Sequence, residues 1–263
     1  TVNDVGSGIL LGIGGDRMKK SDFLKEEREA VRIARLAGAI LLERFHQEHQ
    51  VTMKGLVELL TEADLASEAL IRQELSRAFP RDSLLGEEDG GPACDLGRVW
   101  IFDPLDGTTN YAHRVPIFSV SIALCEDGVP KAGAIFNPVC GDMFHASEGN
   151  GACLGEKPIQ VSAQDSLEKS LVVTGFPYRI PECLEEVLAP LRRMILASQG
   201  VRRLGSASLD LCYVASGIFE LFWERGLKAW DIAAGTIILR EAGGVITDYR
   251  GQSLKLDGQE MLA

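Results

Sequence analysis

The sequence predicts a layered α+β fold, and three observations along the chain support this prediction. Apolar residues near the N-terminus recur at helical spacing. Between residues 117 and 162, extended segments alternate with turn signals at roughly 10-residue intervals. After residue 171, short apolar strands alternate with helical segments. We therefore expect an antiparallel sheet in an N-terminal lobe, residues 18–160, a second, mixed sheet in a C-terminal lobe, residues 161–263, and one module formed by both.

Two helices are expected to open the N-terminal lobe. Ser21 or Asp22 can cap the first, which runs to about Gln47. Thr61 begins a pattern that resembles a capping box and predicts a second helix that ends before Pro80. The other expected segments are a connector over 51–60, a meander over 117–162, a strand over 171–174, a helix over 182–197, a helix ending near 217, and strands over 218–224 and 245–247.

Composition limits the class of protein. The chain has 263 residues, 46% hydrophobic and 25% charged, which suits a globular core. A net charge of -11 argues against nucleic acid or an anionic membrane as the main partner. No apolar run approaches the roughly 20 residues that span a bilayer. Met18 is typical of a native start, so we expect residues 1–17 to be a tag or a disordered extension.

Cysteine usage indicates a reducing compartment. The six cysteines contain no Cys-x-x-Cys pair and no zinc-type spacing. Scattered thiols in a chain of this length favour a cytoplasmic protein with reduced cysteines, and a disulfide framework is the minor alternative.

The most informative stretch is VWIFDPLDGTTN, residues 99–110. An apolar strand ends at Asp103, and a second acid, Asp106, follows three residues later. Crowded carboxylates repel each other and lose solvation unless a cation joins them. Gly107 and the threonines after it suit a turn into a helix N-terminus, where backbone N–H groups bind anions. The stretch therefore predicts a metal site beside a phosphate site.

Simpler interpretations exist for every acid. Asp103 and Asp106 can each form turns, and Glu87 lies in an acidic loop between glycines, which is typically solvated. Asp64 can be an acid that stabilises the start of a helix. Asp231 can be the N-cap of a buried apolar helix that runs through Ala242. A calcium loop does not fit, because Pro104 and Leu105 interrupt the ligand pattern. The Asp-x-Asp-Gly-Thr motif of haloacid-dehalogenase-like phosphatases does not fit either, because its two acids stand one residue closer together than Asp103 and Asp106.

Taken together, the acids have a more specific interpretation. Glu87, Asp103, Asp106 and Asp231 would form an all-oxygen site for hard divalent cations. Two Mg²⁺ ions a few ångströms apart can promote an in-line phosphoryl transfer.

Several blocks of the chain resemble the inositol monophosphatase family. The strongest are DPLDGTTN at 103–110 and WDIAAG at 230–235, supported by LTEAD at 60–64, GEE at 86–88 and GSA at 205–207. The resemblance covers the chain from about Asp22 onward. It implies a five-layer αβαβα sandwich of the sugar-phosphatase type and hydrolysis of a small phosphomonoester.

The resemblance also implies roles for individual residues. The implied metal ligands are Glu87, Asp103, the Leu105 carbonyl, Asp106 and Asp231. Thr108, paired with Asp64, would activate the nucleophilic water together with Glu87, and Asp106 would help to protonate the leaving alkoxide. The implied substrate contacts are Gly107 and Thr108 for phosphate, Ala207 and Glu224 for inositol hydroxyls, and the loop residue Lys54.

The implied activity is Mg²⁺-dependent hydrolysis of myo-inositol 1-phosphate by a lithium-sensitive, cytoplasmic homodimer. The resemblance implies two Mg²⁺ ions and an optional third, whose loop carries Glu58 where many relatives have Asp. Fructose 1,6-bisphosphate and nucleotide phosphates stay open as substrates, because Arg202 and Arg203 could bind a second phosphate. A different class of function, a non-catalytic partner in a transcription complex, is the other alternative.

Overall fold

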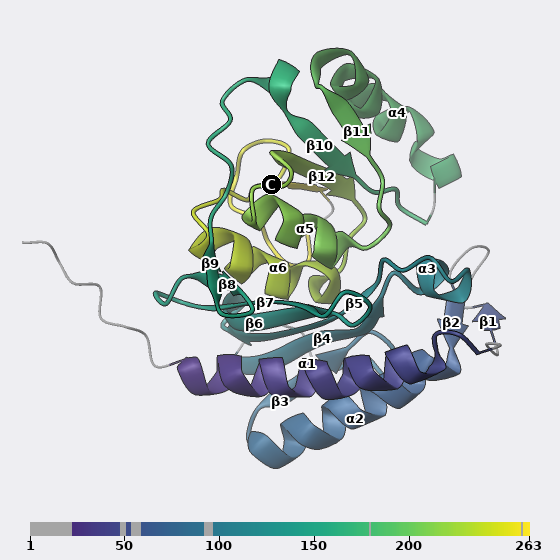
Figure 1. The fold of residues 1–263 in the computed structure, drawn as a ribbon, viewed down its shortest axis with the longest axis vertical. Helices are drawn as coiled ribbons and strands as arrows, with labels where there is room; N and C mark the ends of the chain where they lie inside the picture. The colour runs from purple at the N-terminus through teal and green to yellow at the C-terminus, as the bar shows by residue number, and fades with distance from the viewer. Residues whose placement is uncertain (1–22, 48–50, 54–58, 92–96, 179, 259) are drawn as a thin grey trace, which may run out of the picture.

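The computed structural model describes residues 23–47, 51–53, 59–91, 97–178, 180–258 and 260–263. Helices and sheets alternate through five layers in Figure 1: two helices, a seven-stranded sheet, two central helices, a four-stranded sheet and one outer helix. This order confirms the predicted layered α+β fold. Residues 1–17, predicted to be a tag or a disordered extension, lie outside the described ranges. The positions of Lys54 and Glu58 lie outside them as well.

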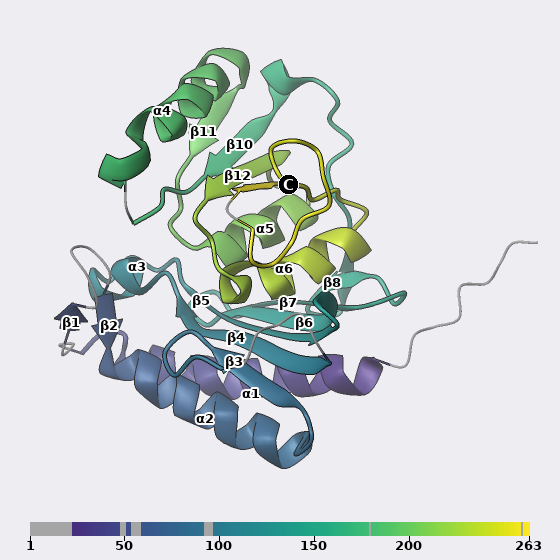
Figure 2. The same ribbon diagram turned by 180° about the vertical axis from the view of Figure 1, so that it is seen from behind.

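The first layer consists of α1 (Leu24–Arg44) and α2 (Glu62–Ala78), which lie side by side on the outer face of the large sheet (Figure 2). Helix α1 begins after Phe23 without a side-chain cap and ends three residues before Gln47. The capping box predicted at Thr61 is present at the start of α2. Both helices bury one apolar face, as their helical spacing predicts.

The seven-stranded sheet has the order β3-β4-β5-β6-β7-β8-β9. It is antiparallel except where β3 pairs parallel with β4. Strand β3, which was not predicted from the sequence, forms one edge of this sheet. Its strands are β3 (Ser83–Gly86), β4 (Arg98–Asp106), β5 (Ser119–Glu126), β6 (Val129–Asn137), β7 (Asp142–Ser147), β8 (Ala152–Leu154) and β9 (Lys157–Ile159).

The four-stranded sheet has the order β11-β10-β12-β13 and is mixed, because β13 alone runs antiparallel to its neighbour. Its strands are β10 (Leu171–Thr174), β11 (Gly200–Arg202), β12 (Leu221–Arg225) and β13 (Glu260–Leu262). The strand predicted over 245–247 is wrong. Val245 is exposed, Thr247 forms only isolated bridges, and β13 takes the sheet edge beside β12.

A second correction concerns the predicted connector over 51–60. Strands β1 (Val51–Met53) and β2 (Leu59–Thr61) pair there as a short antiparallel hairpin. Each strand contributes only three residues, which is too few for a periodic signal in the sequence.

Helices α5 (Ala207–Ala215) and α6 (Ala229–Glu241) form the central layer between the two sheets (Figure 1). Both are apolar around their circumference, and Ile238 and Leu239 of α6 are fully buried. A helix that is covered by a sheet on either side needs no polar face. This layer brings the C-terminal half of the chain against the carboxyl end of β4.

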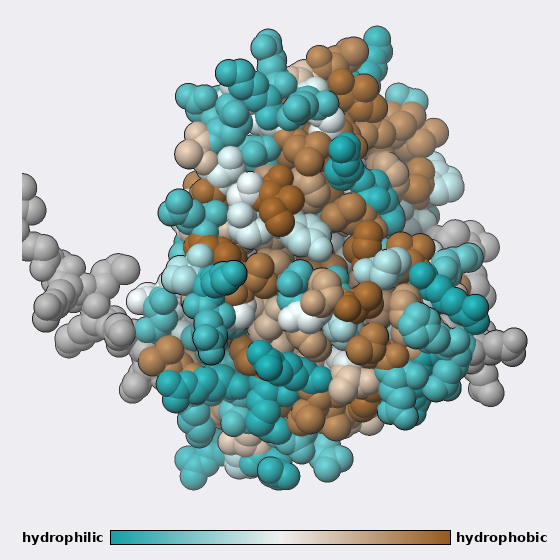
Figure 3. Space-filling model, in the orientation of Figure 1, coloured by the Kyte–Doolittle hydropathy of each residue, from teal (hydrophilic) through white to brown (hydrophobic). Residues whose placement is uncertain are grey.

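Helix α4 (Ile180–Ala197) forms the outer layer and is mostly exposed. Apolar side chains gather over it in Figure 3, and four of them are more than one-third exposed: Leu184, Leu188, Ile195 and Leu196. Within the part of the chain that the structure describes, no helix combines the length and hydropathy needed to cross a bilayer.

A partly buried ion pair joins α1 to the large sheet and should make stability depend on pH. The Nδ1 atom of His145 lies 2.6 Å from Glu27 Oε1, and Nε2 lies 2.8 Å from the Gly155 carbonyl. Both ring nitrogens face acceptors, so both contacts form only when the imidazole is protonated. The hydrogen bond to Glu27 raises the pKa of His145, the Gly155 carbonyl adds to this effect, and burial opposes it.

We therefore expect His145→Asn to lower the free energy of unfolding by roughly 1–2 kcal/mol at pH 6 and by less at pH 8. A raised folded-state pKa gives stability that is fully present below the unfolded pKa and is lost as the pH rises through the folded pKa. Urea unfolding of both proteins between pH 5.5 and 8 checks this. A difference that does not change with pH would contradict it.

Candidate active site

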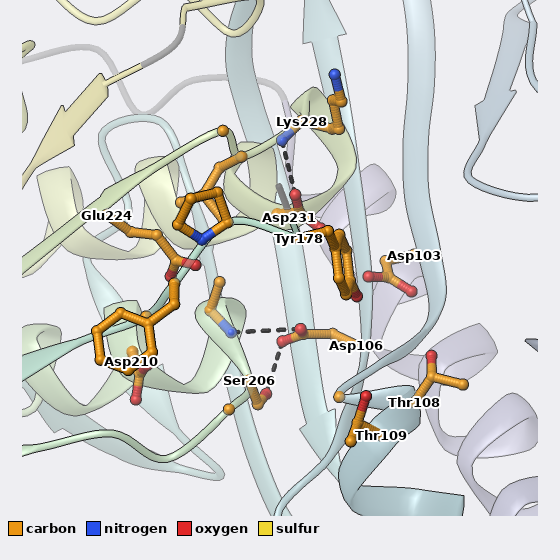
Figure 4. A pocket seen from close by; sticks show the side chains of 18 of the residues that line it. Asp103, Asp106, Thr108, Thr109, Tyr178, Ser206, Asp210, Glu224, Lys228 and Asp231 are labelled. Atoms are coloured by element: carbon orange, nitrogen blue, oxygen red, sulfur yellow. Dashed lines mark hydrogen bonds between the residues drawn. The ribbon is translucent and has the colours of Figure 1, made fainter. Parts of the chain in front are cut away.

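A cavity of about 660 Å³ lies where the end of β4 meets the starts of α5 and α6. Most of the site residues predicted from the sequence line it: Glu87, Asp103, Leu105, Asp106, Gly107, Thr108, Ala207, Glu224 and Asp231. Figure 4 shows several of them around the cavity, with Asp103 and Thr108 on one side and Glu224 on the other. Asp64 does not line it but contacts Thr108 from behind, and Lys54 lies outside the described residues.

A bulge in β4 brings its two acids to the same cavity. Residues three apart on a regular strand point to opposite faces. The pairing of β4 with β5 shifts register between Asp103 and Asp106, which removes this opposition. The turn is held by the Leu105 amide, which donates to Asp103 Oδ1 at 2.9 Å, and by the Ser67 hydroxyl, which donates to the Pro104 carbonyl at 2.9 Å.

Gly107 turns the chain from β4 into the short helix α3 (Thr108–Ala112). Its φ of 95° lies in the left-handed region, and a Cβ there would meet the carbonyl oxygens of Ile117 and Gly205 at 3.1 and 3.2 Å. The first intrahelical bond runs from the Tyr111 amide to the Gly107 carbonyl. The preceding amides of the first turn have no intrahelical acceptor, as an anion site requires.

The start of α5 holds Asp106 in place. Oδ2 accepts hydrogen bonds from Ser206 Oγ at 2.6 Å, Ser208 N at 2.9 Å and Ser208 Oγ at 2.5 Å. Oδ1 accepts only one long bond, 3.3 Å, from the Ala207 amide. Burial raises the pKa of Asp106, and these hydrogen bonds oppose that effect. Oδ1 is therefore the oxygen with most capacity left for a further ligand.

Asp231 occupies a different helix position from the one predicted. The N-cap of α6 is Lys228, and Asp231 stands at the third helical position, where its Oδ2 accepts from the Lys228 amide at 2.6 Å. Its carboxyl group thus satisfies an amide just outside the helix and stays at the cavity wall. Burial raises the pKa of Asp231 well above its usual value, and the charges of Asp106 and Glu87 add to this.

Asp103 experiences the field of the whole acid group. The residue is 2% exposed. Burial, followed by the charges of Glu87, Asp106 and Asp231, raises the pKa of Asp103 well above its usual value. Like charges in one desolvated site destabilise each other until a cation neutralises them.

The acidic loop that carries Glu87 is anchored by α2 and is not a freely solvated loop. Glu68, 2% exposed, accepts hydrogen bonds from the amides of Glu88 and Asp89, each at 3.0 Å. Arg72 binds Glu68 at 2.8 Å and the Gly90 carbonyl at 2.7 Å. This pair was not predicted from the sequence. Its only signal was an acid and an arginine at i and i+4 on the predicted helix.

Thr108 and Asp64 form a hydrogen-bonded pair under the cavity. Asp64 is fully buried, and its Oδ2 accepts from the Thr61 amide at 2.8 Å in the capping box. The Thr108 hydroxyl lies 3.3 Å from Asp64 Oδ1 and 3.0 Å from the Leu105 carbonyl, so its single proton can go to either acceptor. The same acid thus begins α2 and orients a hydroxyl at the cavity wall.

The opposite wall contains Glu224, Asp210 and Arg203. The pKa of Glu224 is raised to about 8, chiefly by burial, while Arg203 opposes this shift and Asp106 adds to it. Glu224 lies close to Gly175, because a Cβ at Gly175 would fall 2.0 to 2.3 Å from the carboxyl atoms of Glu224. Asp210 was not predicted, although an acid between Leu209 and Leu211 in an apolar helix was a signal.

The donor set fits a hard divalent cation. Carboxylate and carbonyl oxygens are the ligands that such ions prefer, and the mutual repulsion at Asp103 is the observation that calls for positive charge. Among the described residues, no three His, Cys, Asp or Glu side chains lie close enough to count as a metal-binding group. The acids share one cavity but do not form a closed ligand set.

Comparison with known proteins identifies the relatives of this chain. The family model described as "Inositol monophosphatase family" matches residues 24–263. An inositol-1-monophosphatase of Synechocystis is 42% identical over 86% of this chain and 80% of its own length. The Nus factor SuhB of Pseudomonas aeruginosa is 39% identical over 89% of both chains. The solved inositol monophosphatase of Anabaena matches with a TM-score of 0.84 and 40% identity, covering 92% of this chain and 91% of that one.

The fold, the acid-lined cavity and these matches define a phosphoric monoester hydrolase. Within that class, the chain belongs to the inositol monophosphatase family. The family is generally metal-dependent, in agreement with the donor set described above.

Proposed function

We propose that this enzyme hydrolyses myo-inositol 1-phosphate to inositol and phosphate in a Mg²⁺-dependent reaction. The observation that carries the proposal is a single cavity with distinct ends. Buried acids and the first amides of α3 lie at one end, and Glu224 and Asp210 lie at the other. The first end suits a phosphate with its cations, and the second suits uncharged hydroxyl groups.

Glu87, Asp103, Asp106, Asp231 and the Leu105 carbonyl would hold two Mg²⁺ ions, with an optional third. Bound Mg²⁺ supplies positive charge for the phosphoryl oxygens and lowers the pKa of water. The amides of Gly107 and Thr108 would hold the phosphate. We also propose the lithium sensitivity that the family resemblance implies.

Thr108 and Asp64 would orient the attacking water. When the Thr108 hydroxyl donates to Asp64, its lone pairs can accept a hydrogen bond from the water, and Glu87 would take part in deprotonation. Asp64 is thus a positioning residue that acts through Thr108. The water oxygen bonds to phosphorus, the ester bond to the inositol oxygen breaks, and Asp106 would assist protonation of that oxygen. No covalent enzyme intermediate is required.

Substrate choice follows from the charges on the far wall. Glu224 would form hydrogen bonds with hydroxyls, and when it is ionised it would repel a second phosphate. Ala207 also lines the cavity, and its small side chain would leave room for the ring. Arg203 would instead favour a second phosphate, because it lines the same cavity with a positive charge. Arg202 is not among the lining residues.

A substrate panel tests the proposal. With Mg²⁺, we expect kcat/KM for myo-inositol 1-phosphate to exceed that for fructose 1,6-bisphosphate and for nucleotide phosphates by at least about tenfold. Chelation should abolish turnover, and readdition of Mg²⁺ should restore it. A higher kcat/KM for fructose 1,6-bisphosphate would contradict the substrate, whereas unchanged turnover in chelator would contradict the metal.

The relatives named Nus factor support a second candidate function. Several proteins with that name are 36% to 39% identical over most of this chain. A non-catalytic role in a transcription complex would be favoured if no phosphomonoester were turned over with Mg²⁺. The presence of Glu87, Asp103, Asp106 and Asp231 at one cavity supports the enzyme. We also propose a cytoplasmic homodimer, supported by the five free cysteines among the described residues and the exposed apolar side chains of α4.

A further inference from the structure

Asp210 is a buried acid that none of the roles above accounts for. It is 1% exposed and lies in the first turn of α5. Its Oδ1 atom is buried and has no hydrogen-bond partner. In the part of the chain that the structure describes, only Glu26 Oε2 and Thr236 Oγ1 share this condition. An unsatisfied buried acceptor costs stability, so its retention calls for an explanation.

Nearby protein groups do not supply the missing donor. Arg203 lines the same cavity, but its guanidinium carbon lies 5.7 Å from the centre of the Phe176 ring and Oδ1 of Asp210 stays unpaired. Glu224, the second acid of this wall, makes no hydrogen bond to Oδ1 of Asp210, which has no partner among the described residues. Figure 4 places Asp210 and Glu224 on the same side of the cavity, away from Asp103 and Thr108. A donor must therefore come from whatever fills this end.

We propose that Asp210 is a specificity-determining residue that accepts a hydrogen bond from a ring hydroxyl of the substrate, next to the hydroxyl held by Glu224. The inference rests on the proposed function and deepens it. Two neighbouring acceptors select a polyol with adjacent free hydroxyls over a phosphomonoester that has none. The acid is kept for recognition even though it destabilises the free protein.

The test compares two substrates on the full-length chain with Mg²⁺. Phenyl phosphate has the same ester but no ring hydroxyl. We expect Asp210→Ala to lower kcat/KM for myo-inositol 1-phosphate by on the order of tenfold to a hundredfold, and to change kcat/KM for phenyl phosphate by less than about threefold. The melting temperature should stay the same or rise, because an unsatisfied acceptor is removed.

Thr236→Val is the matched control. Thr236 also has an unpaired buried oxygen, but it lies on α6 away from the lining of the cavity. This variant should keep the kinetics of both substrates. Equal losses of kcat/KM on both substrates in Asp210→Ala, or a lowered melting temperature, would show a structural role and overturn the inference. Unchanged kinetics on both substrates would overturn it too.

Failure of the proposed function has a different signature. In that case the wild type itself would turn over neither ester with Mg²⁺. Calorimetric binding of myo-inositol 1-phosphate then tests Asp210 without turnover. Weaker binding by Asp210→Ala than by wild type supports the inference, and equal or absent binding overturns it.

Discussion

Replacing Asp103 by asparagine is expected to reduce Mg²⁺-dependent turnover by at least about a thousandfold, the range in which an essential electrostatic group acts. Asp103 lies at the centre of the acid group, where three other carboxylates act on it. The amide keeps the shape of the side chain but removes the charge that a divalent cation requires. Steady-state kinetics with myo-inositol 1-phosphate across a range of Mg²⁺ concentrations measures the effect.

Stability separates a lost metal site from a lost fold in the Asp103 variant. Without metal, Asp103→Asn should melt at the same temperature as the wild type or higher, since one of several mutually repelling buried charges is gone. Mg²⁺ should raise the melting temperature of the wild type but not of the variant. Asp142→Asn, outside the cavity, is the control and should behave as wild type. Retained turnover in Asp103→Asn would contradict the two-metal proposal.

Replacing Thr108 by valine should lower kcat by about a hundredfold to ten-thousandfold with little change in KM. Valine has the shape of threonine but cannot pass a proton between water and Asp64. The hydroxyl lies 3.3 Å from Asp64 Oδ1, and the phosphate would be held by backbone amides that the change does not touch. Pre-steady-state and steady-state turnover with saturating Mg²⁺ checks the prediction.

A conservative variant controls for packing at Thr108. Thr108→Ser keeps the hydroxyl and should retain most of the kcat, because only a methyl group is removed. Equal kcat loss in the valine and serine variants would indicate a packing effect. A valine variant with wild-type kcat would show that Thr108 takes no part in orienting water.

The acids of the site and the order of elements are features that the sequence determined. They include the carboxylates at 103 and 106, the glycine that follows them and the matching blocks elsewhere. These chemical groups are set by the residue types and do not depend on packing. Helical spacing and turn residues likewise predicted α1, α2, the meander and the buried α6, because each pattern has a local physical cause.

Short pairings depended on tertiary contacts and were not predicted. Strands β1, β3, β11 and β13 have three or four residues each, and they exist only because a neighbouring strand offers free hydrogen-bonding groups. At the predicted strand 245–247, only Thr247 pairs, through isolated bridges to Ser253 and to Leu262 of β13. The sequence alone does not show which segment will reach a sheet edge.

Within the cavity, the sequence supplied the residues and the tertiary structure decided their partners. The bulge after Asp103, the four donors on Asp106 and the anchoring of the Glu87 loop by Glu68 join residues up to about one hundred positions apart. Asp210 illustrates the limit most clearly. An acid in an apolar helix is visible in the sequence, but only packing shows that one of its oxygens is buried beside the cavity without a donor.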